Sequence, residues 1–261
     1  MFTKLTEEDF YILREPLKSG RQSPGSLGGI LFLGCFLQFL MYYLIYYIAA
    51  ESTVYPGVEK IQTIHLWVTV ILTAFSAIFS ISTVYKKFEK TQYLLSIIVS
   101  QNLFGIYLYL GALFLIGEAG NVTEGFLINF TTITLGTAVA LFLAVFARFY
   151  FLLKKRKYRE GSTKAERREK FETTSYIPIA IIASTGLVLI VNSLMKNDVL
   201  GGSNESVIFT ILPLLIFFTM IFILPEQLVI LYCKFRFKSF NFNLNGRLYS
   251  IDNTKHNTSR K

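Results

Sequence analysis

The feature that most constrains this chain is a series of apolar runs, each about 20 residues or longer, separated by short polar segments. An α-helix rises about 1.5 Å per residue, so about 20 residues cross the roughly 30 Å hydrocarbon core of a bilayer. The runs therefore predict an all-α, polytopic membrane helix bundle. Its six predicted transmembrane spans are about 27–49, 64–85, 93–116, 126–153, 176–195 and 207–233.

Charged residues are scarce and clustered. Only 16% of the 261 residues are charged and 52% are hydrophobic, whereas soluble domains are about 25% charged. The net charge of +9 would suit nucleic-acid binding, but the excess bases flank the predicted spans, where membrane topology alone places them. The sequence contains no recognisable nucleic-acid-binding motif. We therefore expect a lipid bilayer with anionic headgroups as a partner and no nucleic acid.

Lysine and arginine are distributed unevenly between the two sides that six spans would separate. One side carries 24 of the 26 bases, and ten of these lie between Arg148 and Lys170. The loops on the other side carry only Lys60 and Lys196. Cytoplasmic loops of membrane proteins are enriched in bases. The bias therefore predicts that the N-terminus and the C-terminus are both cytoplasmic.

The chain divides into two polar tails and a transmembrane domain between them. In the tail of residues 1–26, Thr6 and Asp9 have the spacing of a helix-capping box. One interpretation of this tail is a short interfacial helix that runs to about Leu17, and the alternative is a disordered segment. Residues 27–233 form the transmembrane domain, and residues 234–261 form a basic, polar cytoplasmic tail.

The polar side chains inside the predicted spans define a candidate intramembrane site. Glu226 is the only carboxylate well inside a span, and it follows Pro225, which removes one helical hydrogen bond. An ionisable side chain within a membrane indicates a functional site. The alternative is that the span ends near Leu224 and that Glu226 lies at the interface, paired with Arg148 or another base. The candidate site comprises Glu226, Gln227, Arg148, Gln101, Asn102, Asn129 and Asn192.

Hydroxyl side chains line one face of the second predicted span. They recur at spacings of four, three and four residues, which places them together on a helix. Small residues on one face favour close helix packing in lipid, and the alternative is a polar lining for a permeation path. The residues are Thr69, Thr73, Ser76 and Ser80.

Basic residues at the inner ends of the fourth and sixth predicted spans are expected to contact anionic lipid headgroups. Such juxtamembrane bases are attracted to the negative surface of the cytoplasmic leaflet. The expected contact residues are Lys154, Lys155, Arg156, Lys157, Lys234, Arg236 and Lys238.

No catalytic, cofactor-binding or metal-binding motif is recognisable in the sequence. Cys35 and Cys233 fall in apolar runs near opposite ends of the chain, so they do not form a disulfide framework. His65 lies at the entrance to a span and His256 in the C-terminal tail, which does not suit a zinc site. We therefore expect no enzymatic activity, no metal and no cofactor.

The six-span layout with a polar N-terminal tail resembles that of ABC-exporter permease subunits and of small Gram-positive membrane immunity or accessory proteins, without a shared motif. The layout favours a non-enzymatic protein that acts through protein or lipid contacts. The alternatives are a transporter or permease subunit, which would have a polar cavity and an ABC nucleotide-binding partner, and a lipid-modifying enzyme. Convergence of the intramembrane amides on one cavity would favour transport. The composition, rich in Lys, Asn, Ile and Phe, favours a bacterial plasma membrane.

Overall fold

The computed structural model describes residues 5–118, 122–162 and 204–251. This part of the chain is helical, with short connections and one isolated antiparallel bridge between Phe242 and Leu248. The prediction of an all-α fold is therefore confirmed. The predicted span 176–195 and its candidate residue Asn192 lie outside the described residues.

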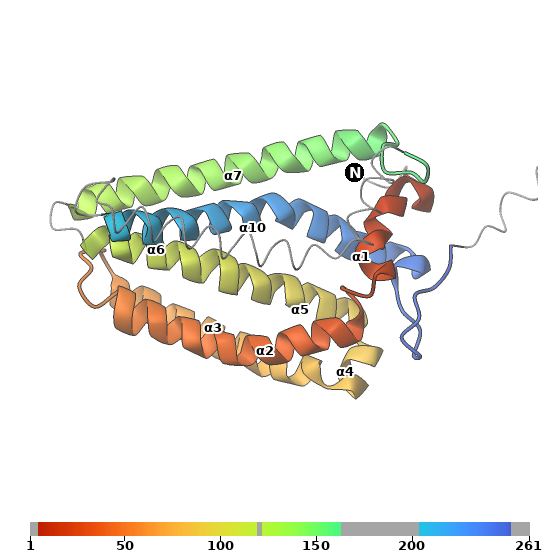
Figure 1. Ribbon diagram of the computed structural model, residues 1–261, viewed down its shortest axis with the longest axis horizontal. Coiled ribbons are helices and arrows are strands. Elements are labelled where there is room, and N and C mark those ends of the chain that lie inside the picture. Colours follow the sequence, from red (N-terminus) through yellow and green to blue (C-terminus); the bar gives the residue numbers. More distant parts are fainter. Residues whose placement is uncertain (1–4, 119–121, 163–203, 252–261) are drawn as a thin grey trace, which may run out of the picture.

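The described chain forms a bundle of long helices with short helical segments at one end (Figure 1). The N-terminal segment is a 3-10 helix followed by a single turn of α-helix. Two of the long helices contain π-helical stretches. The elements are the 3-10 helix Glu7–Arg14, α1 (Glu15–Lys18), α2 (Pro24–Tyr43) with the π-helix Leu44–Ala49, α3 (Val58–Ser80), α4 (Ser82–Lys87), α5 (Glu89–Gln101) with the π-helix Asn102–Ile106, α6 (Tyr107–Glu118), α7 (Glu124–Lys154), α10 (Asn204–Arg236) and the 3-10 helix Lys238–Phe240.

Within the described residues, five helices are long and apolar enough to cross a membrane, and each overlaps one predicted span. Their bounds are Pro24–Ala49, Val58–Ser80, Glu89–Glu118, Glu124–Lys154 and Thr210–Arg236. The second of these helices ends at Ser80, before the predicted end of its span at Tyr85. Ile81 adopts extended backbone angles (φ −76°, ψ 127°), which end α3 at Ser80 before α4 begins.

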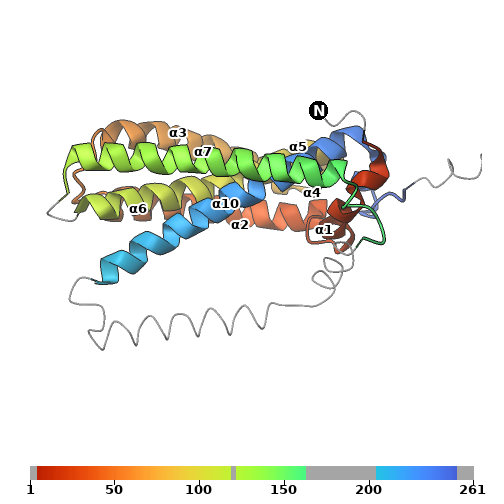
Figure 2. The ribbon, with the colours of Figure 1, turned by 90° about the horizontal axis from the view of Figure 1, so that it is seen from above.

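The continuous helix α5–α6 lies at the centre of the bundle. In the most apolar 18-residue stretch of α5–α6, 61% of the residues are buried. In the most apolar 18-residue stretch of α7, only 11% are buried. The α5–α6 helix packs against α2, α3 and α10, and α7 lies outside, against α10 and α6. Figure 2 shows that α10 crosses the bundle obliquely. The long exposed apolar face of α7 suits contact with lipid.

Helix α10 continues through both of its prolines, Pro213 and Pro225. The helix therefore runs on past Leu224 to Arg236, so Glu226 is part of this helix in both interpretations, inside the span or at the interface. Proline has no N–H, so the carbonyl of Ile221, four residues before Pro225, loses its helical donor. A single such loss is tolerated within a helix that is packed along its length against its neighbours.

The N-terminal segment, residues 155–162 and the C-terminal segment gather at one end of the bundle, which we term the capped end (Figure 1). Thr6 and Asp9 form the predicted capping box. Four apolar side chains of the N-terminal segment, Phe10, Ile12, Leu13 and Leu17, are at most 1% exposed, so in the structure this stretch is folded against the bundle. They pack against the ends of α5, α7 and α10 and form one hydrophobic cluster with them. The buried residues of this cluster are Phe10, Ile12, Leu13, Leu17, Leu27, Tyr93, Ile97, Phe149, Leu153, Tyr158, Val229, Ile230, Cys233 and Phe240.

Candidate functional site

The adjacent amides of Gln101 and Asn102 contact different helices. Gln101 Nε2 donates a hydrogen bond to the carbonyl of Met220 on α10, at 3.1 Å. Asn102 Oδ1 lies 2.9 Å from His65 Nε2 on α3. Both interactions tie neighbouring helices together, which is the ordinary use of a polar side chain within a helix bundle.

The other predicted amides do not join them. Asn129 is exposed on the outer helix α7, and Gln227 is half-buried on α10. Within the described residues, the predicted amides therefore do not converge on one polar cavity. The hydroxyl face of α3 is likewise used for packing, because Thr69 and Ser76 are fully buried.

Arg148 and Glu226 are the two predicted site residues that the fold brings together. They lie on α7 and α10, which pack against each other, and they line one cavity of about 350 Å³. Arg148 is exposed and Glu226 is half-buried. The remaining described lining is mainly apolar and comprises Val145, Phe149, Leu152, Tyr158, Phe222 and Ile223.

Most of the bases that were expected to contact lipid are on the surface of the capped end. Lys154, Lys155, Arg156 and Lys157 are exposed at the end of α7 and in the turn that follows. Arg236 and Lys238 are exposed around the end of α10. Their charged groups therefore have the accessibility that contact with a headgroup requires.

Lys234 is the exception, because only 1% of its surface is exposed. Its ammonium donates to Glu89 Oε1 at 2.8 Å and to the carbonyl of Phe240 at 3.0 Å. The rings of Tyr93 and Phe242 each lie 5.4 Å from it. The prediction that Lys234 contacts lipid headgroups is wrong, because its charge is enclosed and paired inside the protein.

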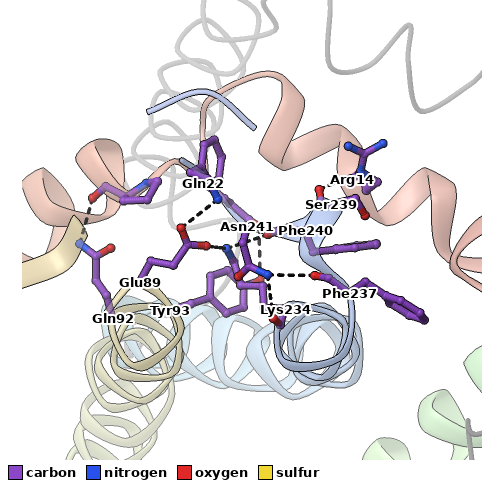
Figure 3. A network of polar contacts seen from close by, with 12 residues as sticks. Arg14, Gln22, Glu89, Gln92, Tyr93, Lys234, Phe237, Ser239, Phe240 and Asn241 are labelled. Atoms are coloured by element: carbon purple, nitrogen blue, oxygen red, sulfur yellow. Dashed lines mark hydrogen bonds and ion pairs between the residues drawn. The ribbon is translucent and has the colours of Figure 1, made fainter. Parts of the chain in front are cut away.

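The ion pair of Lys234 belongs to a larger polar network that fastens the C-terminal segment to the bundle (Figure 3). Glu89 Oε2 accepts a hydrogen bond from the backbone N–H of Phe242, at 2.9 Å. Asn241 Nδ2 donates to the carbonyls of Lys234 and Phe237, at 2.8 and 2.9 Å. We term the group formed by Glu89, Lys234 and Asn241 the clasp.

The N-terminal segment is held by charged groups of its own. Arg14 donates to the carbonyls of Ser239 and Tyr249, at 3.2 and 2.7 Å. Asp9 Oδ1 lies 2.6 Å from Arg159 Nε, in the turn after α7. Burial alone would raise the pKa of Asp9, but hydrogen bonds from Thr6 and the ion pair with Arg159 outweigh it and hold that pKa below its usual value.

A second buried polar group, which the sequence did not reveal, surrounds His65 inside the bundle. His65 Nδ1 lies 2.8 Å from the hydroxyl of Tyr46, and Nε2 lies 2.9 Å from Asn102 Oδ1. The ring of Tyr107 lies 4.3 Å from the imidazole, and its hydroxyl is 2.5 Å from that of Thr69. Tyr46 and Asn102 both belong to π-helical segments, which occur frequently at functional sites. We term these five residues the His65 cluster.

The position of His65 concealed this cluster at the sequence level. The predicted span began at residue 64, which placed His65 at a membrane entrance, whereas α3 begins at Val58. His65 precedes Thr69 by four residues and extends its buried face. That spacing was a usable signal, but the two π-helical segments that supply the partners have no recognisable sequence pattern.

Comparisons with known proteins provide no further assignment, since no family model, curated protein or solved structure matches the chain. Within the described residues, no three His, Cys, Asp or Glu side chains are grouped so that they could hold a metal ion. The candidate functional features of the described chain are thus the basic surface of the capped end, the cavity between α7 and α10, and the His65 cluster.

Proposed function

We propose that this chain is a non-enzymatic, multi-pass integral membrane protein of the bacterial plasma membrane. It has six spans and two cytoplasmic termini, and it acts through contacts with anionic lipid headgroups and with other proteins at its capped end. The proposal rests on one observation, the combination of exposed bases and a folded cap at the capped end. Exposed bases surround a folded cap that the clasp and Arg14 fasten to the bundle.

The course of the described chain supports a sixth span. Helix α7 leads to residue 162 at the capped end, and α10 begins with Asn204 at the opposite end (Figures 1 and 2). A connection between the two ends needs an odd number of crossings, and the predicted span 176–195 supplies one. Six crossings place both termini on one side, in agreement with the distribution of the bases.

The permease alternative has less support. It required the intramembrane amides to line a common cavity, and Gln101 and Asn102 instead contact different helices. A transport path also requires polar groups that water or a substrate can reach. The hydroxyl face of α3, which was the other candidate lining, is buried at Thr69 and Ser76.

Cysteine labelling tests the topology. In a Cys35→Ala, Cys233→Ala background, we expect Lys87→Cys to resist a membrane-impermeant maleimide in intact cells and Glu51→Cys to react. Both positions are exposed in the fold, so a difference reports sidedness and not burial. After the cells are opened, both should react. Labelling of Lys87→Cys in intact cells would contradict the proposed orientation.

Lipid retention tests the basic surface. The protein is purified from bilayers that contain equal amounts of phosphatidylglycerol and phosphatidylcholine, and the retained lipids are quantified by mass spectrometry. Replacing Lys154, Lys155, Arg156 and Lys157 together by Gln should lower the excess of phosphatidylglycerol. Lys60→Gln, in the first turn of α3 and on the opposite side of the membrane in the proposed topology, is the control and should leave the excess unchanged. An unchanged excess in the fourfold variant would refute lipid contact at this surface.

A further inference from the structure

We propose that the cavity between α7 and α10 binds the headgroup of a phospholipid that carries a primary amine, of the ethanolamine class. The lipid would come from the leaflet that faces the capped end. This inference rests on the membrane insertion proposed above, but it does not rest on the lysine-rich surface that carries that proposal. The site consists of Arg148, Glu226 and the apolar walls around them.

The charges in the cavity match a zwitterionic headgroup. A guanidinium has a planar fork of N–H donors that fits two phosphate oxygens, so Arg148 is suited to the phosphodiester. A carboxylate offers two oxygens and about four acceptor positions, so Glu226 is able to accept N–H groups from an ammonium while it makes other contacts. A choline headgroup has no N–H to donate, and a glycerol headgroup leaves the lipid with a net negative charge beside Glu226. The pair therefore favours ethanolamine over both.

The apolar walls and the size of the cavity suit the rest of the lipid. A volume of about 350 Å³ falls in the range of about 300–1,000 Å³ that is typical of sites for small ligands. Phe222 and Ile223, which line the cavity, are also exposed on the outer surface of α10. Leu143 and Phe151 are exposed on α7. Acyl chains are thus able to follow apolar side chains from the cavity into the bilayer.

The depth of the two charges also suits a headgroup site. Arg148 precedes Lys154 by six residues, or about 9 Å along the helix, and Glu226 precedes Lys234 by eight residues, or about 12 Å. Both charges therefore lie at similar depths, slightly below the basic end of the bundle. Ionised side chains deep in hydrocarbon are costly, and a bound zwitterion would add a group of opposite charge beside each of them.

The test measures which lipids the full-length protein retains from a bilayer that contains equal amounts of phosphatidylethanolamine, phosphatidylcholine and phosphatidylglycerol. We expect the wild type to retain an excess of phosphatidylethanolamine. Arg148→Gln should lower this excess about tenfold, because it removes a charge-assisted contact with the phosphate. Glu226→Gln should retain phospholipid but lose the preference for ethanolamine over glycerol headgroups. Lys60→Gln, an exposed base at the start of α3 and outside the cavity, should retain the wild-type preference.

A cavity-filling variant keeps the test decisive if either charge substitution impairs folding. Val145→Phe leaves both charges in place and should lower retention of phosphatidylethanolamine, while the melting temperature in detergent reports folding. A wild type without preference for ethanolamine, or a preference that survives Arg148→Gln, Glu226→Gln and Val145→Phe, would overturn the inference. The proposed function is tested separately, by the phosphatidylglycerol excess that the variant with Gln at positions 154–157 retains.

Discussion

The clasp and the His65 cluster are two buried polar groups that are built differently. The clasp contains full charges and joins side chains that are 145 residues apart in sequence, Lys234 and Glu89. In the His65 cluster, His65 is bonded to partners that are 19 and 37 residues away. The clasp lies at the capped end of the bundle, and the His65 cluster lies among α2, α3 and α5–α6.

This difference follows from the cost of charge in an apolar medium. An ionised side chain becomes more costly with depth in hydrocarbon, so charges are best placed at a helix end. At the capped end, charged side chains fix the N-terminal segment and the C-terminal segment to the bundle. Helices α2 and α3 are already held side by side by a short connection. The hydrogen bonds of the His65 cluster therefore add less to their association. In membrane proteins such bonds contribute on average about 0.6 kcal/mol each. We therefore expect the clasp to contribute more stability than the His65 cluster.

The largest expected effect is that of Lys234→Met. The substitution leaves the carboxylate of Glu89 enclosed without its cation, and loss of one partner of a buried ion pair costs about 3–5 kcal/mol. Chemical denaturation in detergent micelles measures the change in the free energy of unfolding. Arg236→Met, an exposed base two residues further on, is the control and should cost little. Adding Glu89→Gln to Lys234→Met should recover part of the loss. A loss below about 1 kcal/mol for Lys234→Met would show that the clasp is not a major stabilising element.

A smaller loss is expected for His65→Leu. The variant leaves the hydroxyl of Tyr46 and the amide oxygen of Asn102 without their partner, at a cost of about 1–3 kcal/mol. Tyr46→Phe removes only one of the two hydrogen bonds and should cost less. The same denaturation assay ranks the variants. If His65→Leu destabilises as much as Lys234→Met, the distinction between the two clusters fails.

The contact between Asp9 and Arg159 should make a small, pH-dependent contribution of about 1 kcal/mol, because Arg159 is partly exposed. The pKa of Asp9 is lower in the folded protein, so this stabilisation is complete above the ordinary aspartate pKa of about 4. It is lost as the pH falls through the lowered pKa. The difference in unfolding free energy between the wild type and Asp9→Asn should therefore shrink on acidification. A difference that stays constant, or grows, as the pH falls would contradict this assignment.

The features that were predictable from the sequence depend on local patterns. A run of about 20 apolar residues identifies a membrane-length helix because length and hydropathy are properties of the run itself. The capping box of Thr6 and Asp9 was recognisable for the same reason, since both partners lie within one turn. The sequence offered Arg148 as one possible partner of Glu226, but it did not indicate that α7 and α10, which carry them, pack against each other.

The features that sequence reasoning missed depend on contacts between distant residues. Lys234 was assigned to lipid because it ends an apolar run, and nothing near it in the sequence indicates that Glu89 lies beside it. His65 was assigned to a membrane entrance because the predicted span began at residue 64, and its partners Tyr46 and Asn102 come from other helices. The break at Ile81 was missed because no Gly or Pro marks it and because the hydroxyl residues around it, Ser80 and Ser82, are compatible with a membrane helix.

The smallest expected effect has the opposite sign and concerns Gln38 on α2. Its side chain is fully buried, and neither amide atom has a hydrogen-bond partner among the described residues. Burial of such a group costs about 1–3 kcal/mol, so Gln38→Met, which has a similar shape, should be neutral or stabilise the protein by about 1 kcal/mol. Gln92→Met is the matched control. Its amide donates to the carbonyls of Pro24 and Phe79, so its loss should destabilise. If Gln38→Met destabilises as Gln92→Met does, Gln38 is bonded within the bundle, and the buried polar network extends beyond the His65 cluster into α2.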